Sequence, residues 1–99
     1  DGEFGSILYM AGVPTDDATM EQNIEMNWGH IKNGANGMSY MQSVASGPAP
    51  FNATAATWTD SLDSLMVASA SNFADPDVQK VMVDNKVQIL GRVITRRLF

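Results

Sequence analysis

The last quarter of the chain, residues 75–99, constrains the fold most, because it combines a helix start, a wide apolar face and a basic end. Asp75 is a good N-cap, since its carboxylate can accept hydrogen bonds from the free N–H groups of a first helical turn. Pro76 follows at the first helical position, where its missing N–H costs nothing. The sequence therefore predicts one helix of about six turns over residues 75–99.

The large apolar residues of this predicted helix fall within an arc of roughly 180° when they are placed at 100° per residue. They are Met82, Val83, Val87, Ile89, Leu90, Val93, Ile94 and Leu98. Such an arc is wider than a coiled-coil seam, which needs only two positions in seven, so the helix requires neighbours on two sides. We expect more apolar surface here than the rest of a short chain can cover.

Charge is distributed unevenly along the chain, whose net charge is −5. Residues 1–77 hold ten acidic residues and one basic residue, whereas residues 78–99 hold one acidic and five basic residues. Two explanations stay open: the basic end complements its own helix dipole and the acidic front of the same molecule, or it attracts another subunit. Nucleic acid is not expected as a partner, because an acidic chain with a few terminal arginines lacks a basic stripe.

Two further helices are predicted upstream of residue 75. Residues 15–33 begin at a capping Thr15 and carry apolar residues at helical spacing. Residues 57–73 begin with a capping-box pattern formed by Thr57 and Asp60. The short connection between residue 73 and Asp75 predicts that this helix and the terminal one form an antiparallel hairpin.

The remaining segments are less constrained. Residues 38–46 are assigned to a short helix, whereas residues 7–13 are compatible with a strand, an extended arm or the end of a truncated helix. Residues 1–6 look like a cloning remnant and are set apart from the fold. The sequence thus predicts an all-α protein over residues 7–99: a single domain, a small bundle of three to four helices with a C-terminal antiparallel helical hairpin and an N-terminal arm.

No residues suggest a catalytic, cofactor or metal site. The chain contains no cysteine, which excludes disulfides and thiolate metal sites, and its single histidine, His30, cannot build a zinc site without carboxylates. No apolar run reaches the length of a transmembrane helix. We therefore expect a protein that is not an enzyme, binds no cofactor and has no membrane span.

One short motif and one feature of the predicted architecture resemble known families. Asp60-Ser61-Leu62, continued by Asp63 at the head of a predicted helix, resembles the motif of acyl carrier proteins, and the likeness extends over residues 60–73. That resemblance implies a phosphopantetheine arm on Ser61. A cysteine-free helical hairpin with Asp75-Pro76 in its turn and the ending 94–99 is similar to needle-type subunits of bacterial secretion systems, which implies a filament.

The leading hypothesis from sequence is a non-enzymatic helical interaction or assembly domain that associates with itself or with a protein partner through the C-terminal helix. The apolar contact residues would be Leu90, Ile94, Leu98 and Phe99. The basic residues Arg92, Arg96 and Arg97 would steer an acidic partner surface. The alternatives are an acyl-carrier-like domain modified at Ser61 and a helical subunit of a secretion-type filament.

Overall fold

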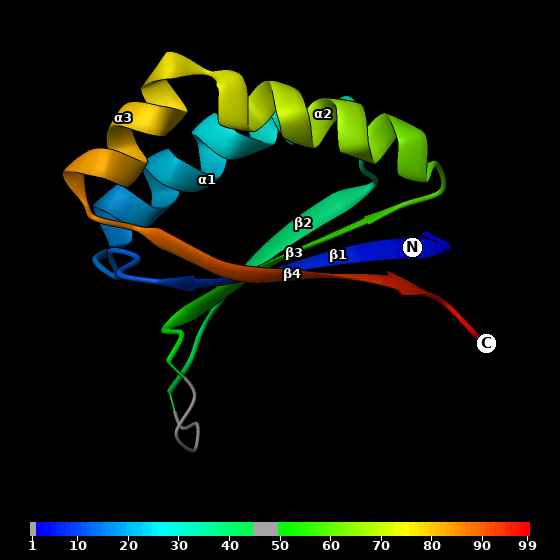
Figure 1. The fold of residues 1–99 in the computed structure, drawn as a ribbon, viewed down its shortest axis with the longest axis horizontal. Helices are drawn as coiled ribbons and strands as arrows, with labels where there is room; N and C mark the ends of the chain where they lie inside the picture. The colour runs from blue at the N-terminus through cyan, green and yellow to red at the C-terminus, as the bar shows by residue number, and fades with distance from the viewer. Residues whose placement is uncertain (1, 45–49) are drawn as a thin grey trace.

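The computed structural model describes residues 2–44 and 50–99, which form one antiparallel sheet covered by a layer of helices. The elements in chain order are β1 (Phe4–Ala11), α1 (Asp17–Ile31), β2 (Gly37–Gln42), β3 (Ala53–Thr59), α2 (Leu62–Ala74), α3 (Pro76–Asp84) and β4 (Gln88–Arg96). The strands lie in the order β2-β3-β1-β4, and each neighbouring pair is antiparallel. The helices cover the same face of the sheet (Figure 1). The predicted all-α bundle is therefore wrong.

Strand β1 occupies the centre of the sheet, so a strand is the correct choice among the three left open for residues 7–13. It pairs with β3 on one side and with β4 on the other. Its side chains alternate: Ser6 and Met10 are buried beneath the helices, while Ile7 and Tyr9 lie on the opposite face. The strand begins at Phe4, so half of the segment set apart as a cloning remnant contributes to the sheet.

The helix predicted over residues 15–33 is confirmed as α1, with its N-cap one residue later than expected. The carboxylate of Asp16, rather than the hydroxyl of Thr15, accepts a hydrogen bond of 3.0 Å from the backbone N–H of Thr19. Between β1 and α1 the chain turns at Gly12, which has a φ of +77°. A Cβ there would lie 2.8 Å from the carbonyl oxygen of Lys86, so glycine suits both the conformation and the space.

The middle of the chain differs most from the prediction. The short helix expected at residues 38–46 is wrong, because residues 37–42 form β2; residues 45 and 46 lie outside the described part. The helix expected over 57–73 begins only at Leu62, and Ser61 rather than Thr57 caps it. Residues 57–59 belong to β3, where β-branched and aromatic side chains suit a strand that has partners on both sides.

The C-terminal segment contains a helix and a strand in place of one long helix. Asp75 as N-cap and Pro76 at the first position are confirmed, since the Asp75 carboxylate accepts hydrogen bonds from the N–H groups of Asp77 and Val78. Helix α3 ends at Asp84, and Lys86, with a φ of +55°, redirects the chain into β4. The six-turn helix and the antiparallel helical hairpin are both wrong, because residues 88–96 pair with β1 instead.

The core lies between the central strands and the helices. One cluster combines Met10 and Val13 with the alanines Ala53 and Ala55 of β3. Leu65 of α2 is the large side chain that is most completely buried among the described residues, with 1% of its surface exposed. Because β3 presents alanines beneath the helices, the sheet and the helical layer do not fill all the space between them, and this leaves room for a cavity.

Candidate functional site

A cavity of about 80 Å³ lies between the helix-covered face of the sheet and the three helices. Its apolar wall consists of Leu8, Met10, Val13, Pro14, Met26, Ile31, Met38, Ala55, Leu65, Phe73, Val78, Val81, Met82, Val87 and Ile89. Its polar lining consists of Ser6, Asn23, Asn27, Tyr40, Thr57, Ser69, Asn72 and Arg92. Mainly apolar walls with a few polar groups are typical of sites that bind small molecules.

The cavity can adapt its shape because four of the seven methionines of the chain line it. They are Met10 on β1, Met26 on α1, Met38 on β2 and Met82 on α3. Unbranched thioether side chains rearrange readily around irregular ligands. No local sequence pattern brings these four residues together, since they come from four different elements.

Two asparagines place a buried hydrogen-bond acceptor at the cavity. Nδ2 of Asn27 donates to the backbone oxygen of Asn23 at 2.7 Å, which leaves Oδ1 of Asn27 to accept from Nδ2 of Asn72 at 2.8 Å. This chain of donors determines which way both amides point. Oδ1 of Asn72, a residue with only 3% of its surface exposed, is consequently left without a partner among the described residues.

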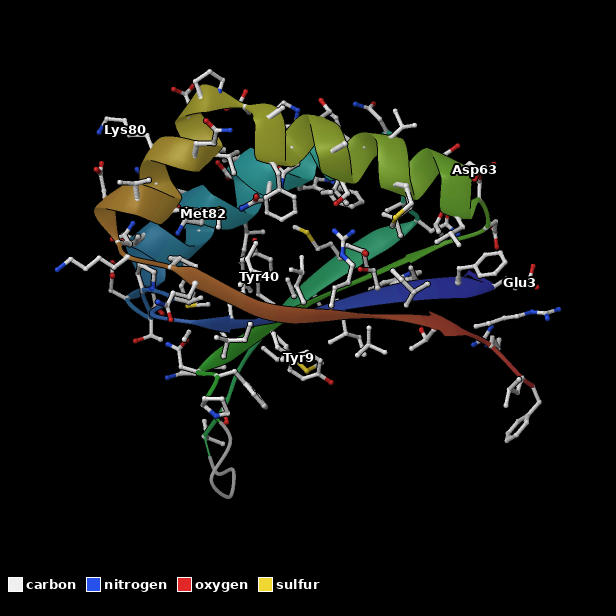
Figure 2. The ribbon with its side chains drawn as sticks, in the orientation of Figure 1. Glu3, Tyr9, Tyr40, Asp63, Lys80 and Met82 are labelled. Atoms are coloured by element: carbon white, nitrogen blue, oxygen red, sulfur yellow. The ribbon has the colours of Figure 1, made fainter. Side chains whose placement is uncertain are left out.

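Tyr40 contributes a hydroxyl from the floor of the cavity. Figure 2 shows its side chain on the helix side of the sheet, whereas Tyr9 points away on the other side. Burial raises the pKa of Tyr40 to about 12, so the phenol stays protonated to a higher pH than an ordinary tyrosine, whose pKa is about 10. No described residue forms a hydrogen bond with this hydroxyl, which makes it available as a donor to a bound molecule.

Arg92 brings positive charge to the cavity from strand β4. Its guanidinium donates one hydrogen bond to the Ser69 hydroxyl and another, of 3.8 Å, to the sulfur of Met66. Both acceptors are neutral, and no described carboxylate lies within ion-pair distance. By contrast, Arg96 on the same strand forms an ion pair with Glu3 at 3.0 Å.

His30 lies outside this cavity, where the three helices meet. Its Nε2 is 3.2 Å from the carboxylate of Asp75, and its Nδ1 is 3.4 Å from the hydroxyl of Ser71. The backbone N–H of Val78 lowers the pKa of the Asp75 carboxyl, and the N–H of Asp77 and the His30 ring add to this effect. Among residues 2–44 and 50–99, no group of three or more histidine or acidic side chains could hold a metal ion.

The residues predicted to bind a partner do not share one face. Arg92 lines the cavity, Arg96 pairs with Glu3, and the backbone N–H of Arg97 donates to the carbonyl of Glu3. Leu90 and Ile94 lie on β4 and are exposed, and Leu98 and Phe99, which follow the strand, are more exposed still. The seven residues thus belong to an edge strand and the tail after it, so a docking surface on a C-terminal helix is wrong.

Ser61 is part of a helix cap. Its hydroxyl accepts from the backbone N–H of Ser64 at 3.3 Å and donates to the Ser64 hydroxyl at 3.0 Å. The motif that resembles acyl carrier proteins therefore lies at a strand-to-helix turn of an α/β sheet protein. Sequence reasoning also missed Tyr40, Asn27 and Asn72; the alternation of Met38 and Tyr40 was the available signal for a strand with one buried face.

The face of the sheet that the helices leave uncovered carries no charged residue among its described strand positions. The strand registers place these side chains on it: Ile7, Tyr9, Ala11, Ser39, Met41, Thr54, Ala56, Trp58, Val93 and Thr95. Phe51 adds an edge-on contact to Tyr9, with ring centroids 5.1 Å apart. We refer to this surface as the open sheet face. In the described part of the chain, no helix has the length and apolar character needed to cross a membrane.

Comparison with known proteins identifies the fold. No protein-family model and no curated protein matches the sequence. The structure is similar to an EthD-like protein from Ralstonia eutropha JMP134, with a TM-score of 0.67 and 15% identity over 100% of this chain and 96% of that chain. A protein from Nitrosomonas europaea, described as a "putative antibiotic biosynthesis monooxygenase", gives a TM-score of 0.55 and 16% identity, covering 97% and 99% of the two chains.

A dimeric ferredoxin-like protein of unknown function from Thermobifida fusca YX has a TM-score of 0.51 and 11% identity, covering 97% of this chain and 90% of that one. At such identities the likeness establishes the fold alone, and the fold is ferredoxin-like. It corrects the hypotheses of a helical assembly domain, a secretion-type helical subunit and an acyl-carrier domain, since none of these is built on a four-stranded antiparallel sheet.

Proposed function

We propose that the chain binds a small, mostly apolar molecule in the cavity between its sheet and its helices. The observation that carries this proposal is the unpartnered acceptor of Asn72 at an apolar, methionine-lined cavity. A buried polar atom without a partner costs about 1–3 kcal/mol, and a bound molecule with a donor group would remove this cost. The free hydroxyl of Tyr40 supports the same function, because it offers a donor from the opposite wall.

Filling the cavity tests the proposal. Ala55→Leu adds apolar volume to the cavity wall, whereas Ala56→Leu adds the same volume one residue later, on the open sheet face. We expect toluene and indole to shift amide NMR signals around the cavity in the wild type and in Ala56→Leu, but not in Ala55→Leu. Equal binding to both variants, or no binding to the wild type at millimolar concentrations, would refute the proposal.

We also propose that two copies associate through the open sheet face. This face has no charged residue at its described strand positions and exposes the apolar side chains of Met41 and Val93, and exposed apolar surface of this kind marks interaction sites. A face without charges can meet its own copy without like-charge repulsion, even though each chain carries a net charge of −5. The ferredoxin-like protein from Thermobifida fusca is itself described as dimeric, which supports a second copy as the occupant.

Two adjacent residues of β4 provide a matched test of this association. Val93 is 45% exposed on the open sheet face, and Ile94 is 42% exposed on the helix side of the same strand. We expect light scattering to show a dimer for the wild type and for Ile94→Glu, but a monomer for Val93→Glu. A monomeric wild type at several hundred micromolar would contradict the proposal, as would dissociation by Ile94→Glu alone.

A second candidate function is catalysis on the bound molecule. Its support is the protonated hydroxyl of Tyr40, which can stabilise a developing oxyanion in a mainly apolar cavity. The Nitrosomonas europaea protein of the same fold is described as a "putative antibiotic biosynthesis monooxygenase", so oxygen consumption is the first activity to measure. With 1-naphthol and hydroquinone as probes, we expect uptake that Tyr40→Phe lowers about 100-fold. Uptake no faster than in buffer would reject this candidate.

A further inference from the structure

Arg92 differs from Arg96 in its position and in its partners: Arg96 forms an ion pair with Glu3, whereas Arg92 lines the cavity and contacts neutral groups. Arg92 stands opposite Leu8 in the pairing of β1 with β4, and both residues line the cavity. Its guanidinium carries five donors, but its hydrogen bonds in the structure go to one hydroxyl and one thioether. A guanidinium with neutral acceptors only, at the edge of an apolar cavity, is suited to pair with a carboxylate.

The negative net charge of the protein limits where an anion can bind. An acidic chain with a net charge of −5 repels anions in general, so binding of an anion here requires a local cation without its own carboxylate partner. Arg96 does not meet this condition, because Glu3 neutralises it. Arg92 meets it, and among the described residues it is the one arginine that lines the cavity.

The acceptor of Asn72 lies close to the same group. Arg92 donates to Ser69, and Asn72 follows Ser69 by three residues on helix α2. Three residues of an α-helix advance about 4.5 Å along its axis and stay on the same side, so both polar contacts face the cavity from neighbouring turns. A molecule that satisfied both would carry an acid and a hydrogen-bond donor about one helical turn apart.

The size of the cavity limits the apolar part of such a molecule. An enclosed cavity of about 150 Å³ holds benzene, and the cavity here measures about 80 Å³. A single ring therefore fits only if the methionines shift or if part of the molecule extends past Ile89, a lining residue of β4 that is 40% exposed. This favours a compact ring acid over a long lipid chain.

We infer that the cavity binds a compact ring carboxylic acid with a hydroxyl or amino group, its carboxylate on Arg92 and its donor on Oδ1 of Asn72. This inference rests on the proposed small-molecule binding and specifies the class of ligand. Ser69 orients the guanidinium, and the Tyr40 hydroxyl donates to the ring substituents. The acceptor on Asn72 separates hydroxylated or aminated acids from their unsubstituted analogues.

The probe for this inference is 3-hydroxybenzoate, titrated calorimetrically into the whole chain at low salt. We expect Arg92→Gln to lower its affinity about 10- to 100-fold, as for a lost charge-assisted hydrogen bond, and Arg92→Lys to lower it less. Arg96→Gln is the matched control and should change the affinity less than about twofold. Benzoate, which lacks the hydroxyl, should bind the wild type about fivefold more weakly without any change to the protein.

The outcomes distinguish the binding of a ring acid from the more general proposal that the cavity binds a small apolar molecule. If neutral toluene and indole bind in a manner that Ala55→Leu blocks, but 3-hydroxybenzoate binds no better than 3-methylphenol, the acid class is refuted and the cavity function stands. If no probe binds, both fail. Equal losses in Arg92→Gln and Arg96→Gln would show a general charge effect and would also overturn the role of Arg92; circular dichroism establishes that each variant is folded.

Discussion

Truncation of Leu65 to alanine should destabilise the protein more than any other single truncation on helix α2. Leu65 is 1% exposed, and its side chain lines the cavity. The loss of three buried carbon groups costs roughly 2.4 kcal/mol at about 0.8 kcal/mol for each. The space left behind adds about 24 cal/mol for each Å³ that the neighbours do not fill. We therefore expect a total loss of roughly 3–4 kcal/mol.

The measurement is urea unfolding followed by tryptophan fluorescence and circular dichroism at one fixed protein concentration. In thermal unfolding at the same protein concentration, a loss of this size should appear as a fall in Tm of roughly 15–25 °C for a chain of this length. Val67→Ala is the matched control: this residue lies on the same helix with 71% of its surface exposed, so its truncation should cost less than about 0.5 kcal/mol.

The same variant reports on the cavity itself. Leu65→Ala enlarges an existing space of about 80 Å³ toward the roughly 150 Å³ at which an apolar cavity binds benzene. Benzene at tenfold its Kd for Leu65→Ala should then restore roughly 1.4 kcal/mol to that variant, and less to Val67→Ala, whose cavity keeps its original size. A cost below about 1 kcal/mol, or an equal response of both variants to benzene, would show that Leu65 does not border an open cavity.

Three further outcomes are expected. Burial raises the pKa of Tyr40 from 10.0 to about 12, so the stabilisation by the protonated phenol is complete below pH 10 and is lost as the pH rises. The free energy of unfolding should therefore fall by roughly 2–3 kcal/mol between pH 10 and pH 12 in the wild type but not in Tyr40→Phe, as measured by urea midpoints. The pKa of Asp75 lies below its ordinary 3.8, so the stabilisation by its carboxylate is present above pH 3.8 and is lost as the pH falls below that value. Asp75→Asn should therefore lower the Tm at pH 7 and make the Tm depend less on pH between pH 2 and 4. An unchanged dependence of the Tm on pH in this range would argue against stabilisation by the Asp75 carboxylate. Gly29→Ala, with open space around the new Cβ, should stabilise α1 by about 0.5–1 kcal/mol, whereas Gly34→Ala, whose Cβ would lie 2.1 Å from a backbone oxygen, should destabilise the fold; stabilisation by both would contradict the packing.

The part of the candidate site that sequence could locate is small. The charge of Arg92 predicted a role in binding, but the predicted place was a helical surface that meets a protein partner, whereas the residue lies on β4 and lines the cavity. Asn27 and Asn72 are 45 residues apart and meet only because α1 and α2 pack side by side. No local sequence pattern indicates that Oδ1 of Asn72 lacks a hydrogen-bond partner, because this depends on which acceptors the neighbouring donors bind in the folded protein.

Local signals determined the elements whose ends depend on nearby residues. The carboxylates of Asp16 and Asp75 cap the N–H groups of the next turn, so these helix starts follow from contacts within four residues. The absence of cysteine likewise excluded thiolate chemistry from composition alone. These features need no distant partner.

Only the tertiary structure determined that residues 88–96 form a strand and not a helix. Val87 to Ile94 shows apolar residues at spacings that fit one face of a helix, yet it is rich in β-branched side chains that suit a strand. The deciding contact is the ladder with β1, which joins Phe4 to Arg96 across almost the full length of the chain. Backbone N–H and C=O groups of a central strand must find partners on both sides, and β1 obtains half of them only if the C-terminal segment becomes β4.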